Sequence, residues 1–226
     1  MNRLAGLSAL LCLSAGPAVA ADLVMPAYSP QPVATASADA FDSDWARAYG
    51  ISELRAGVMM DDIELYSTPV YIVPRPESFH LDNIGTLSAD VLYDTPDLSR
   101  FFTKPDLGGW NWLLSPRPTF GIDLDLKHES MVHASLNWHI PVADTPFFVE
   151  TELGAALHNG ALTDAVPPMR NLGCRALFYW SLNIGYQLTD HWNLLATEQH
   201  ASQDGLCGWH NNQGINYDGV RLSYKF

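Results

Sequence analysis

Polar and apolar residues alternate along most of the chain after residue 50, with the period of two that is typical of β-strands. In residues 119–127, for example, every second side chain is apolar, and Asp123, Asp125 and Lys127 lie between them. Seven further segments show the same alternation, so the sequence predicts eight strands. They lie near residues 51–60, 84–93, 119–127, 132–140, 146–157, 178–186, 190–202 and 217–226.

The predicted connections differ in length at the two ends of these strands. Tight links near 141–145 and 189–190 alternate with long ones near 61–83, 158–173 and 203–216. Membrane barrels combine short periplasmic turns with long outer loops, which gives this asymmetry. The pattern therefore favours a barrel that crosses a membrane.

One connection, near 94–118, is long where a short turn is expected. It contains the aromatic pair Phe101–Phe102 and the largely apolar run Trp110–Leu114. We expect these residues to form a short helix that lies on the membrane surface.

Aromatic residues on the apolar face gather at one end of the predicted strands. If both chain ends are periplasmic, these aromatics all fall at periplasmic strand ends, where membrane barrels carry an aromatic girdle. The final segment, Val220–Phe226, alternates and ends in Phe, like the C-terminal strand that the barrel-insertion machinery recognises. We predict an all-β fold, an eight-stranded antiparallel transmembrane (outer-membrane) β-barrel. The girdle residues are Tyr93, Phe120, Trp138, Phe147, Tyr186, Trp192, Tyr224 and Phe226.

The N-terminus has the features of a secretory signal. Arg3 supplies a positive charge, an apolar core follows, and the Ala18–Ala20 segment is a cleavage signature. We expect residues 1–20 to be a signal peptide that directs export across the inner membrane. An extended lead-in at 21–46 then precedes the barrel domain at 47–226.

Charge and hydropathy exclude two function classes. The chain of 226 residues has a net charge of −13, so it lacks the basic surface that nucleic acids require. Past the N-terminus no apolar stretch reaches the about 18 residues of a transmembrane helix. An eight-stranded barrel is just wide enough to hold side chains, so we expect inward charges to fill it and leave no solute pore. These residues are Glu53, Arg55, Asp90, Asp123, Asp125, Lys127, Glu150, Glu152 and Arg221.

Cysteine and histidine spacing indicates a disulfide and no metal site. Cys12 leaves with the signal, which leaves Cys174 and Cys207 in an oxidising compartment. Both are placed at the outer rim of the predicted barrel, so we expect them to form a disulfide. No CxxC occurs and the eight histidines have no metal-triad spacing, so we expect neither a metal nor a cofactor.

His200 and Ser202 carry the candidate chemistry. They are two residues apart on an outward-running strand, so their side chains point the same way, about 6.5 to 7 Å apart along the strand. Parity places them on the apolar, lipid-facing side, where unsatisfied polar groups are costly. A functional role is the simplest explanation for these two polar side chains on the lipid-facing side. Alternatively, the strand has already left the hydrocarbon at this point and both groups are merely in water.

The chain also resembles a known family, the lipid A 3-O-deacylases of the Gram-negative outer membrane and their acyloxyacyl hydrolase relatives. The resemblance spans about residues 50–226 and is strongest in 157–160, 172–178 and 200–226. The family motif is H-x-S-N near the end of the seventh strand, and this chain has His200-Ala201-Ser202-Gln203. The resemblance implies that Ser202 attacks an ester carbonyl, that His200 takes the serine proton, and that an acid orients the imidazole.

The resemblance further implies an oxyanion hole made by the backbone N–H of Gly205 and the side-chain amide of Asn212. It also aligns Asn216 with the position at which the family carries its acid. Asn216 is neutral, so either Asp218 or Glu198 takes that role, or Asn216 orients the imidazole without a charge in a weakened enzyme. Asp218 can meet His200 laterally across the last hairpin and is favoured, whereas Glu198 lies deeper on the same strand.

The implied function is that of an outer-membrane serine esterase, which removes a 3-hydroxyacyl chain from lipid A of lipopolysaccharide in the outer leaflet. Its partners would be that lipopolysaccharide, the surrounding outer-membrane lipid and the barrel-insertion machinery, with no nucleic acid. One alternative is a catalytically inactive structural barrel of the same family. Another is a soluble lipocalin-like carrier, which is disfavoured because its cavity would be the charged face.

Overall fold

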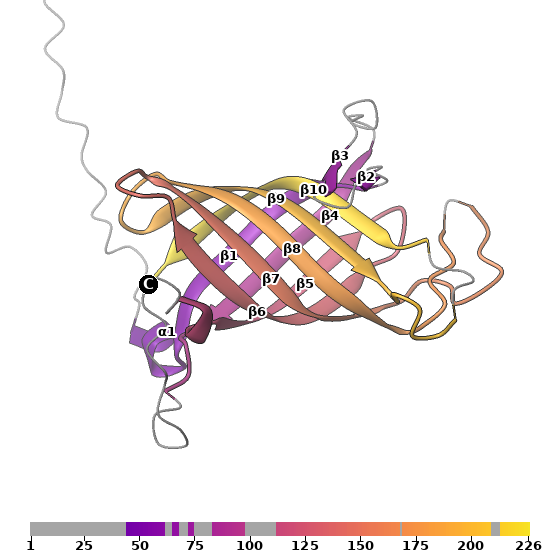
Figure 1. Cartoon of the computed structure of the whole chain (residues 1–226), viewed down its shortest axis with the longest axis horizontal. Helices are drawn as coiled ribbons and strands as arrows, with labels where there is room; N and C mark the ends of the chain where they lie inside the picture. The colour runs from indigo at the N-terminus through magenta and orange to yellow at the C-terminus, as the bar shows by residue number, and fades with distance from the viewer. Residues whose placement is uncertain are drawn as a thin grey trace, which may run out of the picture. The chain divides into compact units, whose positions relative to one another are not determined.

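Eight strands of the computed structural model close into a barrel in which every neighbouring pair is antiparallel (Figure 1). Around the barrel the order is β1, β10, β9, β8, β7, β6, β5 and β4, so the first and last strands pair with each other. The predicted fold class and strand number are confirmed. The strands are β1 (Ile51–Met60), β4 (Ile84–Tyr93), β5 (Arg117–Asp125), β6 (Met131–Pro141), β7 (Phe147–His158), β8 (Ala176–Gln187), β9 (Trp192–Ser202) and β10 (Ile215–Lys225).

The structure describes residues 44–61, 65–67, 72–74, 83–97, 112–167, 169–208 and 213–226. The predicted signal peptide at 1–20 and most of the lead-in therefore lie outside the described residues. Within the described residues, no helix is long and apolar enough to cross a membrane.

Two short elements were not predicted from the sequence. The strands β2 (Leu65–Ser67) and β3 (Ile72–Pro74) pair with each other in the connection between β1 and β4. The helix α1 (Asp44–Ala48) occupies the end of the predicted extended lead-in, with Asp44 in its first turn and Arg47 in its last, where each charge complements the helix dipole. The barrel itself begins at Ile51.

The expected membrane-surface helix in the 94–118 connection is described only in part. Residues 112–114 form one turn of 3₁₀ helix, and the Trp138 Nε1–H donates to the carbonyl of Leu113 at 3.0 Å. Phe101, Phe102 and Trp110 lie outside the described residues.

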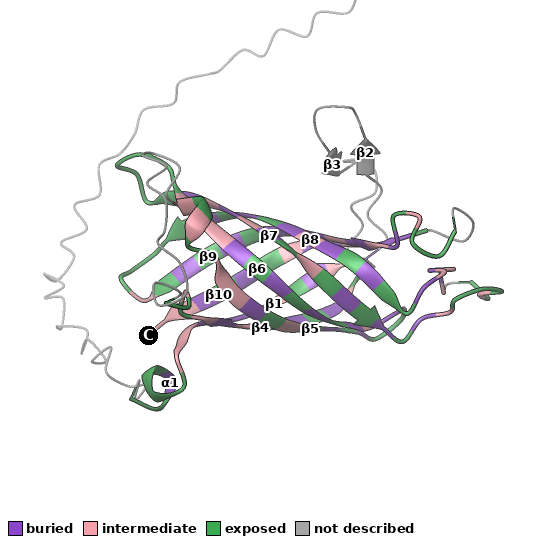
Figure 2. Ribbon diagram, turned by 60° about the horizontal axis from the view of Figure 1, so that its bottom comes forward, coloured by how far each residue is buried: buried purple, intermediate pink, exposed green. Residues whose placement is uncertain are grey.

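The two faces of the strands follow the sequence alternation, as the bands of exposed and buried residues in Figure 2 show. Asp123, Glu150 and Glu152 are fully buried in the interior, and Asp125 is 9% exposed. The predicted register is therefore confirmed, since a slip of one residue would have put these carboxylates outside. The predicted outward side chains are exposed apart from Trp180, which is half-buried: Phe120, Ile122, Leu124, Val132, Leu136, Leu182 and Leu222.

Lys127 was predicted to face the interior, and this prediction is wrong. The carboxylate of Asp125 accepts hydrogen bonds from the backbone N–H groups of Lys127 and His128, at 2.7 and 2.8 Å. This turn ends β5 at Asp125, so Lys127 lies beyond the strand and is exposed.

Ion pairs fill the barrel interior. The Arg55 guanidinium contacts Glu53 at 2.7 Å, Glu150 at 2.6 Å and Glu152 at 3.3 Å. Arg117 bridges the second carboxylate oxygens of Glu53 and Glu150, each at 2.7 Å. This layer joins β1, β5 and β7 through charged groups that are almost completely removed from solvent.

A second interior layer is centred on Arg221, which bonds Asp90, Thr197 and Asn183. Nearby, His133 stacks on the ring of Tyr179 at 4.2 Å. A Cβ added at Gly121 would lie 2.2 Å from His133 Nε2, so the interior has no room for even a methyl group there. The described interior is therefore packed, as a plugged barrel requires.

Edge-to-face ring pairs form the aromatic girdle. Tyr93 meets Phe120 at 5.9 Å, and Phe147 meets Tyr186 at 5.0 Å, each pair across neighbouring strands. The C-terminal residue, Phe226, packs against Trp45 of α1 at 5.6 Å. Figure 1 shows α1 and the C-terminus at one end of the barrel and the long β7–β8 connection at the other.

Candidate functional site

The His200 imidazole lies on the outer face of β9, near the end with the long loops, and two neighbouring strands hold it in place. Asn216 is its direct partner on β10, and the Asn216 Oδ1 lies 2.5 Å from His200 Nδ1. Trp180 is its partner on β8, with ring centroids 5.7 Å apart. When Nδ1–H donates to Asn216, the other ring nitrogen, Nε2, is left as a proton acceptor.

Ser202 follows on the same face, as the last residue of β9, opposite Phe178 on β8. It is half-buried, as is His200. Alternation along the strand therefore places a hydroxyl and a basic ring nitrogen on one side of the barrel wall, which is the pairing that a serine nucleophile needs.

The chain returns to the barrel directly beside this pair. Gly214 has a φ of +71°, and a Cβ at that position would lie 3.2 Å from His200 Cε1 and 3.8 Å from the Ser202 Cβ. A side chain there would combine backbone strain with crowding of the imidazole. Sequence reasoning missed both Gly214 and Trp180 as site neighbours, because their proximity depends on which residues the strands pair.

The predicted oxyanion donors are described only in part. Gly205 lies in the turn after β9, with a φ of +81° that favours glycine, three positions beyond Ser202. Asn212 lies outside the described residues. Gln203, which replaces the asparagine of the family motif, is fully buried, and its side-chain oxygen accepts the Cys207 N–H at 2.8 Å.

Two carboxyl groups face outward two residue pairs further from the rim than His200 and Asn216. Asp218 on β10 lies opposite Glu198 on β9, rather than opposite His200 as the sequence suggested. Glu198 is 8% exposed and Asp218 is 6% exposed, and one oxygen of each has no hydrogen-bond partner. They line a groove of about 350 Å³ together with Met60, Leu182, Ile184, Ala196, Thr197, Gly219 and Val220. Of the three candidate orienting residues, Asn216 is the one that contacts the imidazole.

The predicted disulfide between Cys174 and Cys207 is present, with a Cα–Cα distance of 5.8 Å. It joins the segment before β8 to the turn after β9, at the rim near Ser202. The link therefore holds the loop that carries Gly205 against the β7–β8 connection.

We expect loss of this disulfide to lower the free energy of unfolding by about 2–4 kcal/mol, because it closes a loop of 33 residues. The measurement is urea unfolding of the Cys174→Ser/Cys207→Ser double variant beside the unreduced native chain. A reductant should destabilise the native chain and leave the double variant unchanged, which makes that variant the control. Two reactive thiols in the unreduced mature protein would contradict the assignment.

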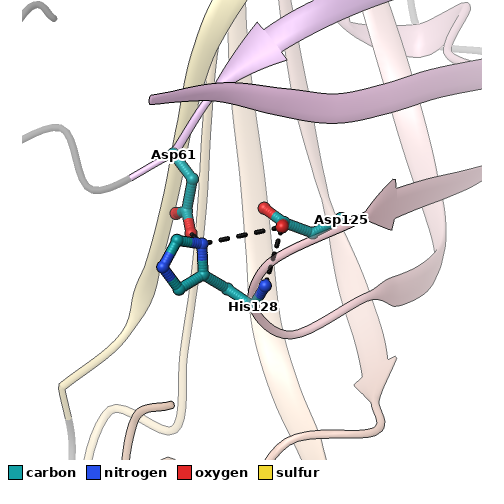
Figure 3. Close-up of side chains that lie close together, drawn as sticks. All are labelled: Asp61, Asp125 and His128. Atoms are coloured by element: carbon teal, nitrogen blue, oxygen red, sulfur yellow. Dashed lines mark hydrogen bonds and ion pairs between the residues drawn. The ribbon is translucent and has the colours of Figure 1, made fainter. Parts of the chain in front are cut away.

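A second cluster of ionisable side chains lies at the rim, where β1 and β5 end (Figure 3). His128 Nδ1 is 2.8 Å from Asp61 Oδ2 and 3.6 Å from Asp125 Oδ1, and the ligand atoms of these residues all lie within 4.8 Å of one another. Arg170 already neutralises Asp61 at 2.7 Å, and two backbone N–H groups occupy Asp125. We therefore assign this cluster to linking the rim strands and assign no metal to it.

Comparisons with known proteins agree with this fold. The family model for lipid A 3-O-deacylase (PagL) matches residues 86–225. The crystal structure of the outer membrane enzyme PagL superposes with a TM-score of 0.50 and 13% sequence identity, covering 77% of this chain and 100% of that one.

Other solved barrels are less similar. The N-terminal β-barrel domain of Pseudomonas aeruginosa OprF has a TM-score of 0.40 and 9% identity, covering 77% of this chain and 98% of that one. Neisserial surface protein A has a TM-score of 0.41 and 11% identity, covering 78% and 96%. No curated protein sequence is significantly similar to this chain. Since the family model covers more than half of the sequence, from β4 to β10, the chain belongs to the PagL family of lipid A 3-O-deacylases.

Proposed function

We propose that this protein is a lipid A deacylase, a serine ester hydrolase that removes a 3-hydroxyacyl chain from lipid A in the outer leaflet of the outer membrane. The observation that carries the proposal is the hydrogen bond between His200 and Asn216 at 2.5 Å, with Ser202 two residues further along the same outward face. Membership of the deacylase family supports the same substrate class.

In the proposed reaction the Ser202 hydroxyl attacks the ester carbonyl, and its proton passes to His200 Nε2. The protonated imidazole then donates this proton to the departing lipid A hydroxyl, which leaves the acyl group on Ser202. Water, deprotonated by His200, hydrolyses this acyl-enzyme and restores the serine. We expect the backbone N–H of Gly205 and the Asn212 amide to stabilise the oxyanion.

Asn216 fits the orienting role in geometry but not in charge. Its oxygen accepts the Nδ1–H in the way that an aspartate does, and Cys-His-Asn proteases use an asparagine at the corresponding place. It cannot, however, compensate the charge of the imidazolium ion that forms when His200 takes the serine proton.

The outward position of the site suits a substrate that is itself a membrane lipid. A lipid A molecule beside the barrel can reach Ser202 without entering the packed interior. We propose that residues 1–20 direct export across the inner membrane, and that Val220–Phe226 serves as the signal for the barrel-insertion machinery.

An inactive structural barrel is the second candidate, because Asn216 stands where the family carries an acid. In serine proteases a neutral replacement of the triad acid lowers turnover by about four orders of magnitude. A carrier protein is a poorer candidate, because the described interior is filled with ion pairs and offers no lipid cavity.

Mass spectrometry of lipid A from cells with and without the protein separates the first two candidates. We expect the protein to remove the mass of one 3-hydroxyacyl chain. Unchanged lipid A, in cells whose outer membrane contains the folded barrel, would instead support the structural role. Outer-membrane fractionation and heat-modifiable gel mobility establish that the folded barrel is present.

A further inference from the structure

Glu198 and Asp218 form a pair of acids on the outer face of the barrel wall. They are direct cross-strand partners, and such partners have Cβ atoms about 4.5–5.5 Å apart. Both are more than nine-tenths buried, and Glu198 Oε1 and Asp218 Oδ2 have no hydrogen-bond partner. Their neighbours in the groove are mainly aliphatic.

Burying two carboxyl groups on this face of the barrel costs free energy, so their presence indicates a functional role. Ionised carboxylates on a lipid-facing surface are disfavoured and are rare there without a function. Two carboxylates at close range cannot both be ionised in a poorly solvated place, so the lowest-energy state of such a pair carries one proton and one negative charge.

The pair lies beside the catalytic imidazole. Glu198 is two residues before His200 on β9, and Asp218 is diagonal to it on β10. Diagonal neighbours are about 7–8 Å apart, within the reach of long side chains. On the described outer face around His200, β8 presents Trp180 and β10 presents Asn216 besides Asp218, so Asp218 and, on β9 itself, Glu198 are the ionisable groups next to the imidazole.

We propose that Glu198 and Asp218 share one proton and supply the negative charge that stabilises protonated His200, while Asn216 supplies only the hydrogen bond that orients the ring. The role of a triad acid is thus divided between a neutral orienting residue and a charged pair. This inference rests on the proposed esterase function and explains how a site with asparagine at position 216 can remain active.

The expected size of the effect follows from Coulomb's law. One unit charge about 7 Å from the imidazolium, at an effective dielectric constant of about 20, changes the rate by roughly 10- to 100-fold. The imidazolium forms only as the reaction proceeds, so the charge should affect kcat and leave KM unchanged.

The shared proton gives a distinctive mutational pattern. Glu198→Gln or Asp218→Asn alone leaves one carboxyl group, which can then ionise and keep the charge, so each single variant should retain nearly full kcat. The double variant should lose about 10- to 100-fold in kcat at constant KM. The assay is acyl release from lipid A by the purified full-length barrel in detergent.

Two further variants control the experiment. Asp144→Asn removes one negative charge, as the double variant does, from an exposed turn at the opposite end of the barrel, and should be silent. Asn216→Asp, introduced into the Glu198→Gln/Asp218→Asn background, places a negatively charged carboxylate in contact with the His200 imidazole and should restore kcat. A purely structural role of the acid pair would not give this rescue.

A double variant with native kcat would overturn the proposal. So would an Asp218→Asn variant as slow as the double variant, because it would show that Asp218 acts alone. Ser202→Ala in the same assay separates this failure from that of the proposed function. If Ser202→Ala is inactive and the double variant has the native kcat, only the proposal of a shared charge is wrong. An active Ser202→Ala variant would contradict both that proposal and the proposed esterase function.

Discussion

Ser202→Ala is expected to abolish release of the acyl chain from lipid A, and His200→Ala is expected to do the same. The serine oxygen forms the new bond to the acyl carbon and the imidazole carries its proton, so neither step has a substitute in the site. Losses of about four to six orders of magnitude are usual for such residues. The double variant should be no worse than either single variant, because the two groups act as a unit.

The measurement is mass spectrometry of lipid A after incubation with each purified barrel. Folding should be unaffected, because both side chains project from the barrel wall and support no interior contact; unchanged heat-modifiable mobility verifies this. Ser52→Ala, on β1, provides a matched serine control far from the site and should retain activity. Undiminished deacylation by Ser202→Ala would remove the nucleophile assignment.

Arg55→Met should lower the free energy of unfolding by about 3–5 kcal/mol, the usual cost of removing one partner from a buried ion pair. The Arg55 guanidinium bonds Glu53, Glu150 and Glu152, all of which are buried. Among the described residues, its loss would leave Glu53 and Glu150 with Arg117 as their guanidinium partner and Glu152 with the neutral donors Ser135 and Asn137. The measurement is urea unfolding of the barrel in detergent micelles.

Arg47→Met provides the control, because Arg47 is exposed on α1 and its loss should change stability little. The free energy of unfolding of Arg55→Lys should lie between those of Arg55→Met and Arg47→Met. Lysine keeps the charge but lacks the planar guanidinium that bonds several carboxylates at once. Adding Glu152→Gln to Arg55→Met should recover part of the lost stability, because it removes one of the buried charges that Arg55 compensated. An Arg55→Met barrel as stable as the native one would show that the interior charges are not coupled.

Alternation along the sequence determined which side chains face the interior and which face outward. The acids Asp123, Glu150 and Glu152 could be placed inside, and His200 and Ser202 outside, before any strand pairing was known. The prediction succeeds because adjacent residues of a strand point to opposite faces of the sheet, and closing the sheet into a barrel buries only one of these two faces.

Strand ends were less predictable, because they depend on local hydrogen bonds rather than on alternation. Lys127 continues the alternation of β5, yet the Asp125 side chain accepts hydrogen bonds from the backbone N–H groups of Lys127 and His128, and the strand ends in this turn. An aspartate followed by a polar run was the available signal.

The pairing of His200 was decided only by the tertiary structure. A shift of two residues between β9 and β10 leaves every side chain on the same face, so the sequence allowed Asp218 as well as Asn216 to lie opposite the imidazole. Closure of the barrel fixes this register through all of its strand pairs at once. The result places a neutral amide on His200 and sets Asp218 against Glu198. The sequence thus determined the face on which the chemistry lies, and barrel closure determined which residues meet there, because a period of two specifies parity but not partners.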